Sequence, residues 1–343
     1  METSLTKQKI RELRKLVADD DRIAIVLQDD PDPDAMSSAI ALRTLLGRNK
    51  QTTPIFAFKP VTRPENLTMT HLLEIQITPA DTEQLRCFDK IAMVDVEPPY
   101  FGDRLPRADI VIDHHPNYTT GLAPFEDIRV DYGATATIMT EYLVTAAEHI
   151  SERLATALLY GIRSDTLALS RRASDADIQA WLHLYPLANY NLLRQIEQPE
   201  LPLSFARLLA RAMGRVEVSD GLIALHLGSV ERDDLIVQMA DFCLQFEGVE
   251  WVAISGKLGS NLVIAVRNRG FGRGNGNAGD LVKRLFNHIG AAGGHRNMAK
   301  AVIPLRKWRQ REGTTRDRVI APRVRELFLN EMLGSDSGSR AAS

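Results

Sequence analysis

The chain has 343 residues, of which 44% are hydrophobic and 25% charged, and its formal net charge is −2. A chain of this length is expected to form about two domains, each large enough to bury its own core. None of its apolar runs reaches the ~18 residues that cross a bilayer. The near-neutral charge excludes the basic composition of a duplex-DNA-binding protein, although it leaves room for a local basic patch.

The two cysteines and the N-terminal segment favour a cytoplasmic location. Cys87 and Cys243 are far apart and neither lies in a C-x-x-C motif, which is typical of proteins in a reducing compartment. The first 21 residues are rich in charge and contain no apolar segment of the kind found in signal peptides. We expect them to form an amphipathic helix.

The first half of the chain alternates short apolar runs with helical segments. The apolar runs cover residues 22–27, 53–58, 90–95 and 108–113. Helices are expected at 35–49, 133–150 and 151–166. Apolar runs that alternate with helices predict an α/β fold built on a parallel sheet.

The pattern changes after a polar stretch at 191–215, which we interpret as a helical connection between domains. Residues 216–228 predict two strands joined by a turn, and 251–266 predict a hairpin with its turn at Gly256–Ser260. Helices are expected near 231–246 and 279–289, and a last strand at 301–305. The chain beyond Leu305 is basic and then weakly helical, and its last ten residues have the composition of a disordered segment.

Acidic side chains follow three of the predicted strands. Asp32 and Asp34 lie on a proline-containing loop after the first strand, Asp95 ends the third and Asp113 ends the fourth. Because the carboxyl ends of parallel strands meet at one edge of a sheet, we expect these side chains to converge. Each also has a purely structural interpretation, since Asp34 is able to cap the next helix and Asp95 to begin a loop.

His114 and His115 follow Asp113 directly, and Asp165 lies at the end of a predicted helix, where it is also able to act as a cap. One imidazole is able to bind a metal while its neighbour faces the substrate, as an acid or as a phosphate contact. Asp113 would orient one of the rings. Four carboxylates and an imidazole are enough for two cations ~3.5–4 Å apart that activate a water for phosphoryl displacement. This mixture of ligands favours Mn²⁺ over Mg²⁺ or Ca²⁺.

The second half carries glycines and cations that suit a phosphate. Glycines allow the close approach of a phosphate to the backbone, and arginine and histidine add charged contacts, although a glycine helix cap explains the same sequence. The candidate residues are Gly293, Gly294, His295 and Arg296, with Arg267, Arg269 and Arg273 on or just beyond a strand edge, as surface or as further contacts. The glycine-rich loop at 270–279 lacks the strand and helix of a dinucleotide-binding motif.

Taken in order, these motifs resemble the DHH phosphoesterase superfamily over residues 20–307. DPDAMSSA at 32–39 is similar to its first motif, Asp95 to the second, Asp113-His114-His115 to the third and GIRSDT at 161–166 to the fourth. GATAT at 133–137 is similar to a segment of many members, and Gly293-Gly294-His295 to the GGH motif of the DHH-associated domain. The two-domain layout most resembles the group of nanoRNases, pAp phosphatases and cyclic-dinucleotide phosphodiesterases.

The resemblance implies a domain organisation and a set of roles. A parallel-sheet catalytic domain at 1–190, with helices on both faces, and a smaller mixed-sheet α/β domain at 216–307 would flank a cleft, with 191–215 as linker and 308–343 as tail. It implies Asp32, Asp34, Asp95, His114 and Asp165 as metal ligands, with Asp95 bridging two ions. It also implies His115 and His295 as phosphate contacts, and Arg267 as a substrate contact beside Gly293, Gly294 and Arg296.

One position departs from the family pattern. The first motif usually begins with a metal-binding histidine four residues before the first aspartate, and here that residue is Gln28. An amide oxygen is neutral and harder than imidazole, so we expect one of the two metal positions to be weak or altered. Asp29 and Asp30 lie close enough in sequence to compensate.

The sequence therefore predicts a hydrolase that needs Mn²⁺, with Mg²⁺ or Co²⁺ as alternatives, and uses His115 and Asp95 as catalytic residues. Its expected substrates are small nucleotides or short single-stranded oligonucleotides, with neither duplex DNA nor a membrane as partner. Two alternatives stay open: a nucleotide-binding regulator weakened at Gln28, and an exopolyphosphatase-type hydrolase. A homodimer is also left open.

Overall fold

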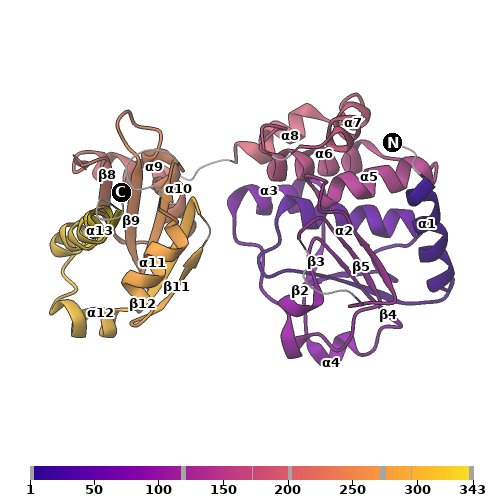
Figure 1. Ribbon diagram of the computed structural model, residues 1–343, viewed down its shortest axis with the longest axis horizontal. Helices are drawn as coiled ribbons and strands as arrows, with labels where there is room; N and C mark the ends of the chain where they lie inside the picture. Colours follow the sequence, from indigo (N-terminus) through magenta and orange to yellow (C-terminus); the bar gives the residue numbers. More distant parts are fainter. Residues whose placement is uncertain are drawn as a thin grey trace. The chain divides into compact units, whose positions relative to one another are not determined.

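A computed structural model describes residues 4–116, 121–171, 173–199, 203–270, 276–294 and 296–339. The chain divides into two compact units, Met1–Glu200 and Leu201–Ser343, and each is described by itself (Figure 1). Within the described part of the chain, no helix has the length and apolar character that a bilayer crossing requires.

The first unit is built on a six-stranded parallel sheet in the order β3-β2-β1-β4-β5-β6. Its strands are β1 (Ile23–Leu27), β2 (Ile55–Ala57), β3 (Ile77–Pro79), β4 (Lys90–Val94), β5 (Ile110–Asp113) and β6 (Phe125–Ile128). The strand order reverses between β1 and β4, which pair directly. In doubly wound sheets, ligands bind at the carboxyl ends of the strands beside such a reversal.

Both faces of this sheet are buried. Ile23, Ile25 and Leu27 of β1 contribute to one core, and the intervening Ala24 and Val26 contribute to another, as strand alternation requires. The helices over the first face include α1 (Ser4–Leu16), α2 (Pro33–Leu45), α5 (Thr135–Thr145) and α6 (Glu152–Thr166). The second face is covered by α4 (Thr82–Leu85) and by segments around the 3₁₀ turns η1 (Pro98–Tyr100) and η2 (Gly102–Arg104). The remaining helices are α3 (Pro64–Leu72), α7 (Asp175–Leu184) and α8 (Tyr190–Glu197).

All four predicted strands are present, and two short edge strands were not predicted. β3 has three residues and ends in proline, so its sequence contains no apolar run. β6 alternates buried Phe125 and Asp127 with partly exposed neighbours, and Asp127 interrupts the expected apolar face. An acidic residue is tolerated there because a buried arginine contacts it, as described below.

The second unit contains a mixed sheet in the order β11-β12-β10-β9-β8-β7. Its strands are β7 (Val218–Ser219), β8 (Leu222–Ser229), β9 (Trp251–Leu258), β10 (Asn261–Asn268), β11 (Ala291–Gly294) and β12 (Met298–Pro304). β8 and β9 run parallel, whereas the other neighbours are antiparallel. Its helices are α9 (Leu203–Met213), α10 (Asp234–Cys243), α11 (Ala278–Phe286), α12 (Leu305–Glu312) and α13 (Asp317–Ser339). The predicted α/β fold of both domains is therefore confirmed.

Two local predictions in this unit differ from the structure. The hairpin turns at Gly259–Ser260, because Gly256 is a residue of β9 packed so closely that an added Cβ would lie 2.8 Å from Ile236 Cδ1. Gly293 and Gly294 form part of an edge strand rather than a helix cap, since Ala291–Gly294 pairs with Ala299–Val302. A glycine-rich segment gives no apolar signal for a strand, although its backbone pairs as well as any other.

The basic C-terminal segment is part of the second core rather than a tail. Trp308 of α12 and Ile320, Val324 and Phe328 of α13 are buried there, at a four-residue spacing within α13 that places them on one helix face. α13 continues to Ser339, over most of the segment for which the composition predicts disorder. Adding residues to an existing helix costs far less than starting one.

The predicted interdomain connection, residues 191–215, contains two helices that pack in different units. α8 contacts α3 and α6 of the first unit, and α9 contacts β8 of the second. The chain divides after Glu200.

Close packing at Gly161 sets the spacing of α2 and α6, and it yields a prediction. An added Cβ at this position would collide with Ser37 Oγ and lie 3.2 Å from the Cα of Asp34. We expect Gly161→Ala to lower the free energy of unfolding by about 1–3 kcal/mol, despite the better helix propensity of alanine. Gly214→Ala is the control, because no atom of the described residues lies within 4 Å of the added atom. Equal denaturation midpoints for the two variants would contradict this packing.

A second prediction concerns His226, which is 2% exposed in β8. Its Nδ1 lies 3.0 Å from Ser255 Oγ, and burial lowers its pKa to about 4, against the opposing effect of Asp317. The unfolded chain therefore binds this proton more tightly than the folded protein. The contribution of the neutral His226 to the free energy of unfolding should be fully present above about pH 6.5. It should be lost as pH falls to about 4, by about 3 kcal/mol in total. Urea denaturation at pH 7 and pH 5 should show a smaller difference for His226→Gln; an unchanged difference would exclude His226 as its source.

Candidate metal centre

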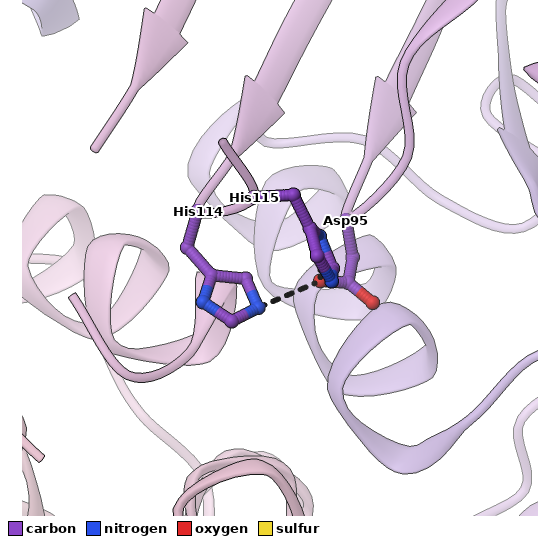
Figure 2. A group of neighbouring side chains, drawn as sticks. All are labelled: Asp95, His114 and His115. Atoms are coloured by element: carbon purple, nitrogen blue, oxygen red, sulfur yellow. Dashed lines mark ion pairs between the residues drawn. The ribbon is translucent and has the colours of Figure 1, made fainter. Parts of the chain in front are cut away.

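The predicted acidic residues gather at the carboxyl edge of the first sheet. Asp95 follows β4, His114 and His115 follow β5, and Asp34 lies in the first turn of α2, which follows β1. Asp165 reaches the same place from the last turn of α6. Figure 2 shows the rings of His114 and His115 turned towards Asp95. The convergence results from the position of β1, β4 and β5 beside one another in the sheet.

His114 lies at the centre of this cluster. Its Nε2 is 3.4 Å from Asp165 Oδ2, 3.5 Å from Asp95 Oδ1 and 3.9 Å from Asp34 Oδ2. The same atom is buried and has no hydrogen-bond partner among the described residues. Burial lowers the pKa of His114, but Asp165 and Asp34 outweigh it and raise the pKa to about 9. Without a cation, a proton is therefore the counter-charge at this position.

A buried polar network fixes the other side of the His114 ring. Its Nδ1 lies 3.1 Å from the carbonyl oxygen of Tyr132, an arrangement that places a proton on Nδ1 and leaves Nε2 facing the carboxylates. Arg129 holds this segment: its guanidinium donates to both carboxylate oxygens of Asp127, to Glu141 and to the hydroxyl of Tyr132. The backbone that orients His114 is thus tied to a buried ion pair.

Asp34 is held by the first turn of α5. Its two carboxylate oxygens accept the amide N–H groups of Thr135 and Ala136, each at 2.7 Å. A helix N-terminus favours a negative charge. Burial and the neighbouring Asp165 nevertheless raise the pKa of Asp34 to about 7. The backbone contacts position the carboxylate without offsetting the effects that raise its pKa.

Asp95 is aimed by its backbone. It has φ of 62°, a left-handed conformation that is unfavourable for a residue with a side chain. Thr135 Oγ1 donates to its Oδ1 at 3.1 Å and Gln28 Nε2 donates to its Oδ2 at 3.3 Å. Burial, followed by the charge of Asp34, raises the pKa of Asp95 well above its ordinary value.

His115 differs from His114 because it is half exposed. Its Nδ1 lies 2.9 Å from Asp113 Oδ1, an oxygen that also accepts the amide N–H groups of His114 and His115. Asp113 is buried, and its hydrogen bond raises the pKa of His115. The predicted orienting role of Asp113 thus has a geometric basis: one carboxylate holds both the turn and the outer ring.

The donor atoms form two overlapping groups that are able to hold a cation. One comprises Asp34, His114 and Asp165, and the other Asp95, His114 and His115, with the ligand atoms of each within 4.8 Å of one another. Carboxylates mixed with imidazole suit a first-row divalent metal. His114 Nε2, which has no hydrogen-bond partner among the described residues and faces three carboxylates, is a suitable donor for such an ion.

The other predicted ligands from the first motif have different surroundings. Asp32 caps α2 by accepting the amide N–H of Ala35 at 3.0 Å. Burial, followed by the charge of Asp165, raises its pKa, and the effect of Asp165 indicates that Asp32 lies near the cluster. Gln28 Oε1 is buried without a hydrogen-bond partner among the described residues, while its Nε2 faces Asp95.

Asp29 and Asp30 are engaged elsewhere, so the expectation that either compensates for Gln28 is not supported. Asp29 contacts Lys59 at 2.7 Å and Arg104 at 3.1 Å. Asp30 accepts the amide and the hydroxyl of Thr62, at 2.7 and 2.8 Å.

In the second unit, the predicted substrate residues lie at one end of the sheet. Gly294 pairs with Ala299 of β12, and Arg267 of β10 pairs with Met298, so these positions are neighbours in the sheet. An added Cβ at Gly294 would collide with the Met298 carbonyl oxygen, which accounts for glycine there. Arg267 itself donates from Nε to Asp241 at 2.6 Å. Arg296 is exposed beside this strand, whereas His295 and Arg273 lie outside the described residues.

The sequence did not predict the roles of Thr135 and Tyr132. Thr135 contacts both Asp34 and Asp95, and Tyr132 orients His114 through its carbonyl oxygen. The GATAT motif marked the position of Thr135, but a main-chain contact such as that of Tyr132 leaves no trace in residue type.

The raised pKa values predict how the metal-free protein responds to pH. The folded state binds protons on Asp34 and His114 more tightly than the unfolded chain, so stability should fall as pH rises. The windows run from 3.8 to about 7 for Asp34 and from 6.5 to about 9 for His114. A bound cation replaces these protons, so Mn²⁺ should raise the melting temperature most at the alkaline end.

Thermal melts between about pH 6 and pH 9, in chelator and in Mn²⁺, measure this effect. Asp165→Asn removes a charge that raises the pKa of both groups, and should reduce both the pH dependence and the Mn²⁺ shift. A melting temperature that is insensitive to both pH and Mn²⁺ would contradict the assignment.

Residues 22–162 match the model of the DHH family, N-terminal domain. Over 285 residues the chain is 34% identical to an uncharacterized protein of Methanocaldococcus jannaschii, and the match covers 82% of this chain and 58% of that relative. The chain thus spans little more than half the length of this relative. A crystal structure of an exopolyphosphatase-related protein from Bacteroides fragilis aligns with a TM-score of 0.68 over 96% of each chain at 15% identity, which indicates a shared fold. Because the matched segment carries Asp34, Asp95 and the Asp113-His114-His115 motif itself, residues 22–162 form a DHH-family N-terminal domain.

Proposed function

We propose that this protein is a metal-dependent phosphoesterase. The observation that carries the proposal is the Nε2 atom of His114, buried without a hydrogen-bond partner in the described structure and 3.4–3.9 Å from oxygens of three aspartates. The DHH-family match of residues 22–162 supports phosphoester hydrolysis as the use of such a site.

Asp34, Asp95, His114 and Asp165 would hold the metal, with Asp95 as the bridging carboxylate and Asp32 as a further ligand. When bound, divalent cations supply a more acidic water and neutralise the charge of a phosphate. Mn²⁺ suits the mixed oxygen and nitrogen donors best, with Mg²⁺ and Co²⁺ as alternatives. The neutral amide of Gln28 makes one of two positions weaker.

His115 would contact the substrate phosphate through Nε2. Its Nδ1 is engaged with Asp113, and this hydrogen bond raises the pKa of the ring and so favours a second proton on Nε2. That proton is able to bond a phosphate oxygen or pass to a departing oxygen. His115 is half exposed, so a substrate is able to reach it.

The substrates proposed are short oligonucleotides, linear or cyclic dinucleotides and pAp. The first domain would carry the chemistry, and Arg267, Gly293, Gly294, His295 and Arg296 of the second would bind substrate. Arg267 would have to leave or share its ion pair with Asp241 to do so. Polyphosphate belongs in the same substrate panel because the similar Bacteroides fragilis protein is described as exopolyphosphatase-related.

One observation favours a second function, a nucleotide-binding protein with weakened catalysis. Gln28 presents an N–H group to Asp95, so the carboxylate proposed to bridge two ions is engaged by a donor that competes with a cation. This alternative predicts ligand binding without turnover in Mn²⁺, Mg²⁺ and Co²⁺.

Activity should depend on Asp95. With Mn²⁺, the purified protein should release mononucleotide from dinucleotides or phosphate from pAp. Asp95→Asn keeps the shape of the side chain but removes the charge, and should lower kcat by at least ~10²-fold. Product release followed by chromatography measures this.

Asp81→Asn is the matched control, because Asp81 is exposed and its side chain does not cap α4. It should retain wild-type kcat. Full activity of Asp95→Asn would overturn the proposed site, whereas binding without turnover in the wild type would favour the alternative.

A further inference from the structure

One segment of the second unit is rich in cations that have no acidic partner among the described residues. Residues 306–325 contain eight arginines and lysines against two acids, although the whole chain has a net charge of −2. Glu312 and Asp317, the two acids, are engaged by Arg311 and Arg323 and by Lys257. The cations that are exposed and have no ion pair or hydrogen bond to an acid within the described ranges are Arg306, Lys307, Arg309, Arg316 and Arg318.

Some arginines elsewhere in this unit contrast with that group. Arg232 contacts Asp234 at 2.7 Å, Arg284 contacts Glu331 at 2.7 Å and Arg325 contacts Glu217 at 2.9 Å. Arg207, Arg211 and Arg215 of α9 are also exposed without an ion pair to an acid among the described residues. The segment 306–325 is distinguished by the hollow that two of its unpaired arginines line.

Two of these arginines line a hollow. Arg306, Arg309 and Gln310 of α12 surround it together with Leu305 and Thr315, and its volume is about 560 Å³. That volume lies in the range of small-molecule sites. Residues three apart on a helix are neighbours, so the two guanidinium groups repel each other in the absence of an anion. The hollow thus combines hydrogen-bond donors with an uncompensated positive charge.

This hollow, the α12 hollow, is distinct from the predicted substrate residues of the same unit. Gly294 and Arg267 lie at the start of β12, where they neighbour Ala299 and Met298. α12 begins where β12 ends, and Leu305 donates its amide N–H to Ser260 in the hairpin turn. Seven strand residues separate the two ends, a distance of about 20 Å. Figure 1 shows α12 following β12 at this end of the sheet.

We propose that the α12 hollow binds backbone phosphates of a single-stranded nucleic acid. Arg306 and Arg309 would each donate two N–H groups to phosphate oxygens, a geometry that guanidinium favours. Gln310 and Thr315 would add neutral donors. The uncompensated positive charge of the hollow indicates that it binds an anion. The choice of nucleic acid over another phosphate chain rests on the proposed function.

Recognition at this hollow is independent of base sequence. None of the described residues that line it is aromatic, and without an aromatic face there is no platform on which bases stack. Phosphate contacts position a strand but carry no sequence information. Binding should therefore strengthen with strand length and weaken steeply with salt.

The experiment uses the full chain in chelator, so that no substrate is consumed. Fluorescence anisotropy measures the binding of labelled single-stranded RNA of two, five and ten nucleotides across a salt series. Affinity should rise with length, and Arg306→Ala/Arg309→Ala should weaken ten-nucleotide binding roughly ten-fold or more. The slope of log affinity against log salt should become shallower by about 1.4, from two lost phosphate contacts.

Two further variants keep the result interpretable. Arg306→Lys/Arg309→Lys retains the charge and should keep most of the slope, while Arg232→Ala/Arg284→Ala removes two paired arginines and should leave affinity unchanged. Melting temperatures within about 1 °C of wild type confirm folding. Unchanged affinity in the alanine variant overturns the inference, as does an equal loss in the Arg232/Arg284 control. The inference is also overturned if the alanine variant loses binding of inorganic polyphosphate but keeps binding of RNA, since this result assigns the hollow to polyphosphate.

Hydrolysis separates this inference from the proposed function. In Mn²⁺, the alanine variant should cleave a dinucleotide at the wild-type rate, because the hollow lies apart from the residues assigned to that substrate. Reduced RNA binding by the variant, in a protein whose wild type cleaves nothing, would remove the proposed function and leave the hollow intact. Cleavage by the wild type, together with unchanged RNA binding by the alanine variant, would support the proposed function and overturn the inference about the hollow.

Discussion

Repulsion between buried carboxylates is the constraint on which the first unit depends. Asp34, Asp95 and Asp165 approach the same imidazole nitrogen. Besides burial, the charge of Asp165 raises the pKa of Asp34, and the charges of Asp34 and Asp165 raise the pKa of Asp95. Such an arrangement costs folding free energy unless protons or cations compensate it. The fold holds the groups in place through contacts that do not themselves neutralise them: amide N–H groups for Asp34 and a left-handed backbone for Asp95.

The support for this cluster comes from elements that are distant in sequence. Arg129 and Glu141 form a buried ion pair that includes the hydroxyl of Tyr132, whose carbonyl oxygen sets the orientation of His114. Thr135 joins the same helix to Asp34 and Asp95. α5 therefore acts as the common anchor of the strand-end residues. A rigid shell of this kind is what a site needs if its donors are to stay close in the absence of an ion.

Much of the fold followed from the sequence because apolar runs such as 22–27 and 108–113 are short and rich in β-branched residues, which favours a strand buried on both faces. The acidic residues at the strand ends converged for the same reason. Contacts made across long separations were not predictable: Asp127 is acceptable in a strand only because Arg129 neutralises it, and Tyr132 acts through its backbone. Gly293 and Gly294 had no strand signal because pairing uses main-chain groups alone.

The packing of α13 determines where the second unit can be cut. Ile320, Val324 and Phe328 fill one core of its sheet, beside Phe286 of α11 and Trp308 of α12. A fragment that stopped at Leu305 would retain every strand and every glycine of the predicted substrate end, yet would open that core to water. Domain boundaries taken from motif positions would thus yield an aggregation-prone piece, and an independently stable second unit must extend through the helix that follows the motifs.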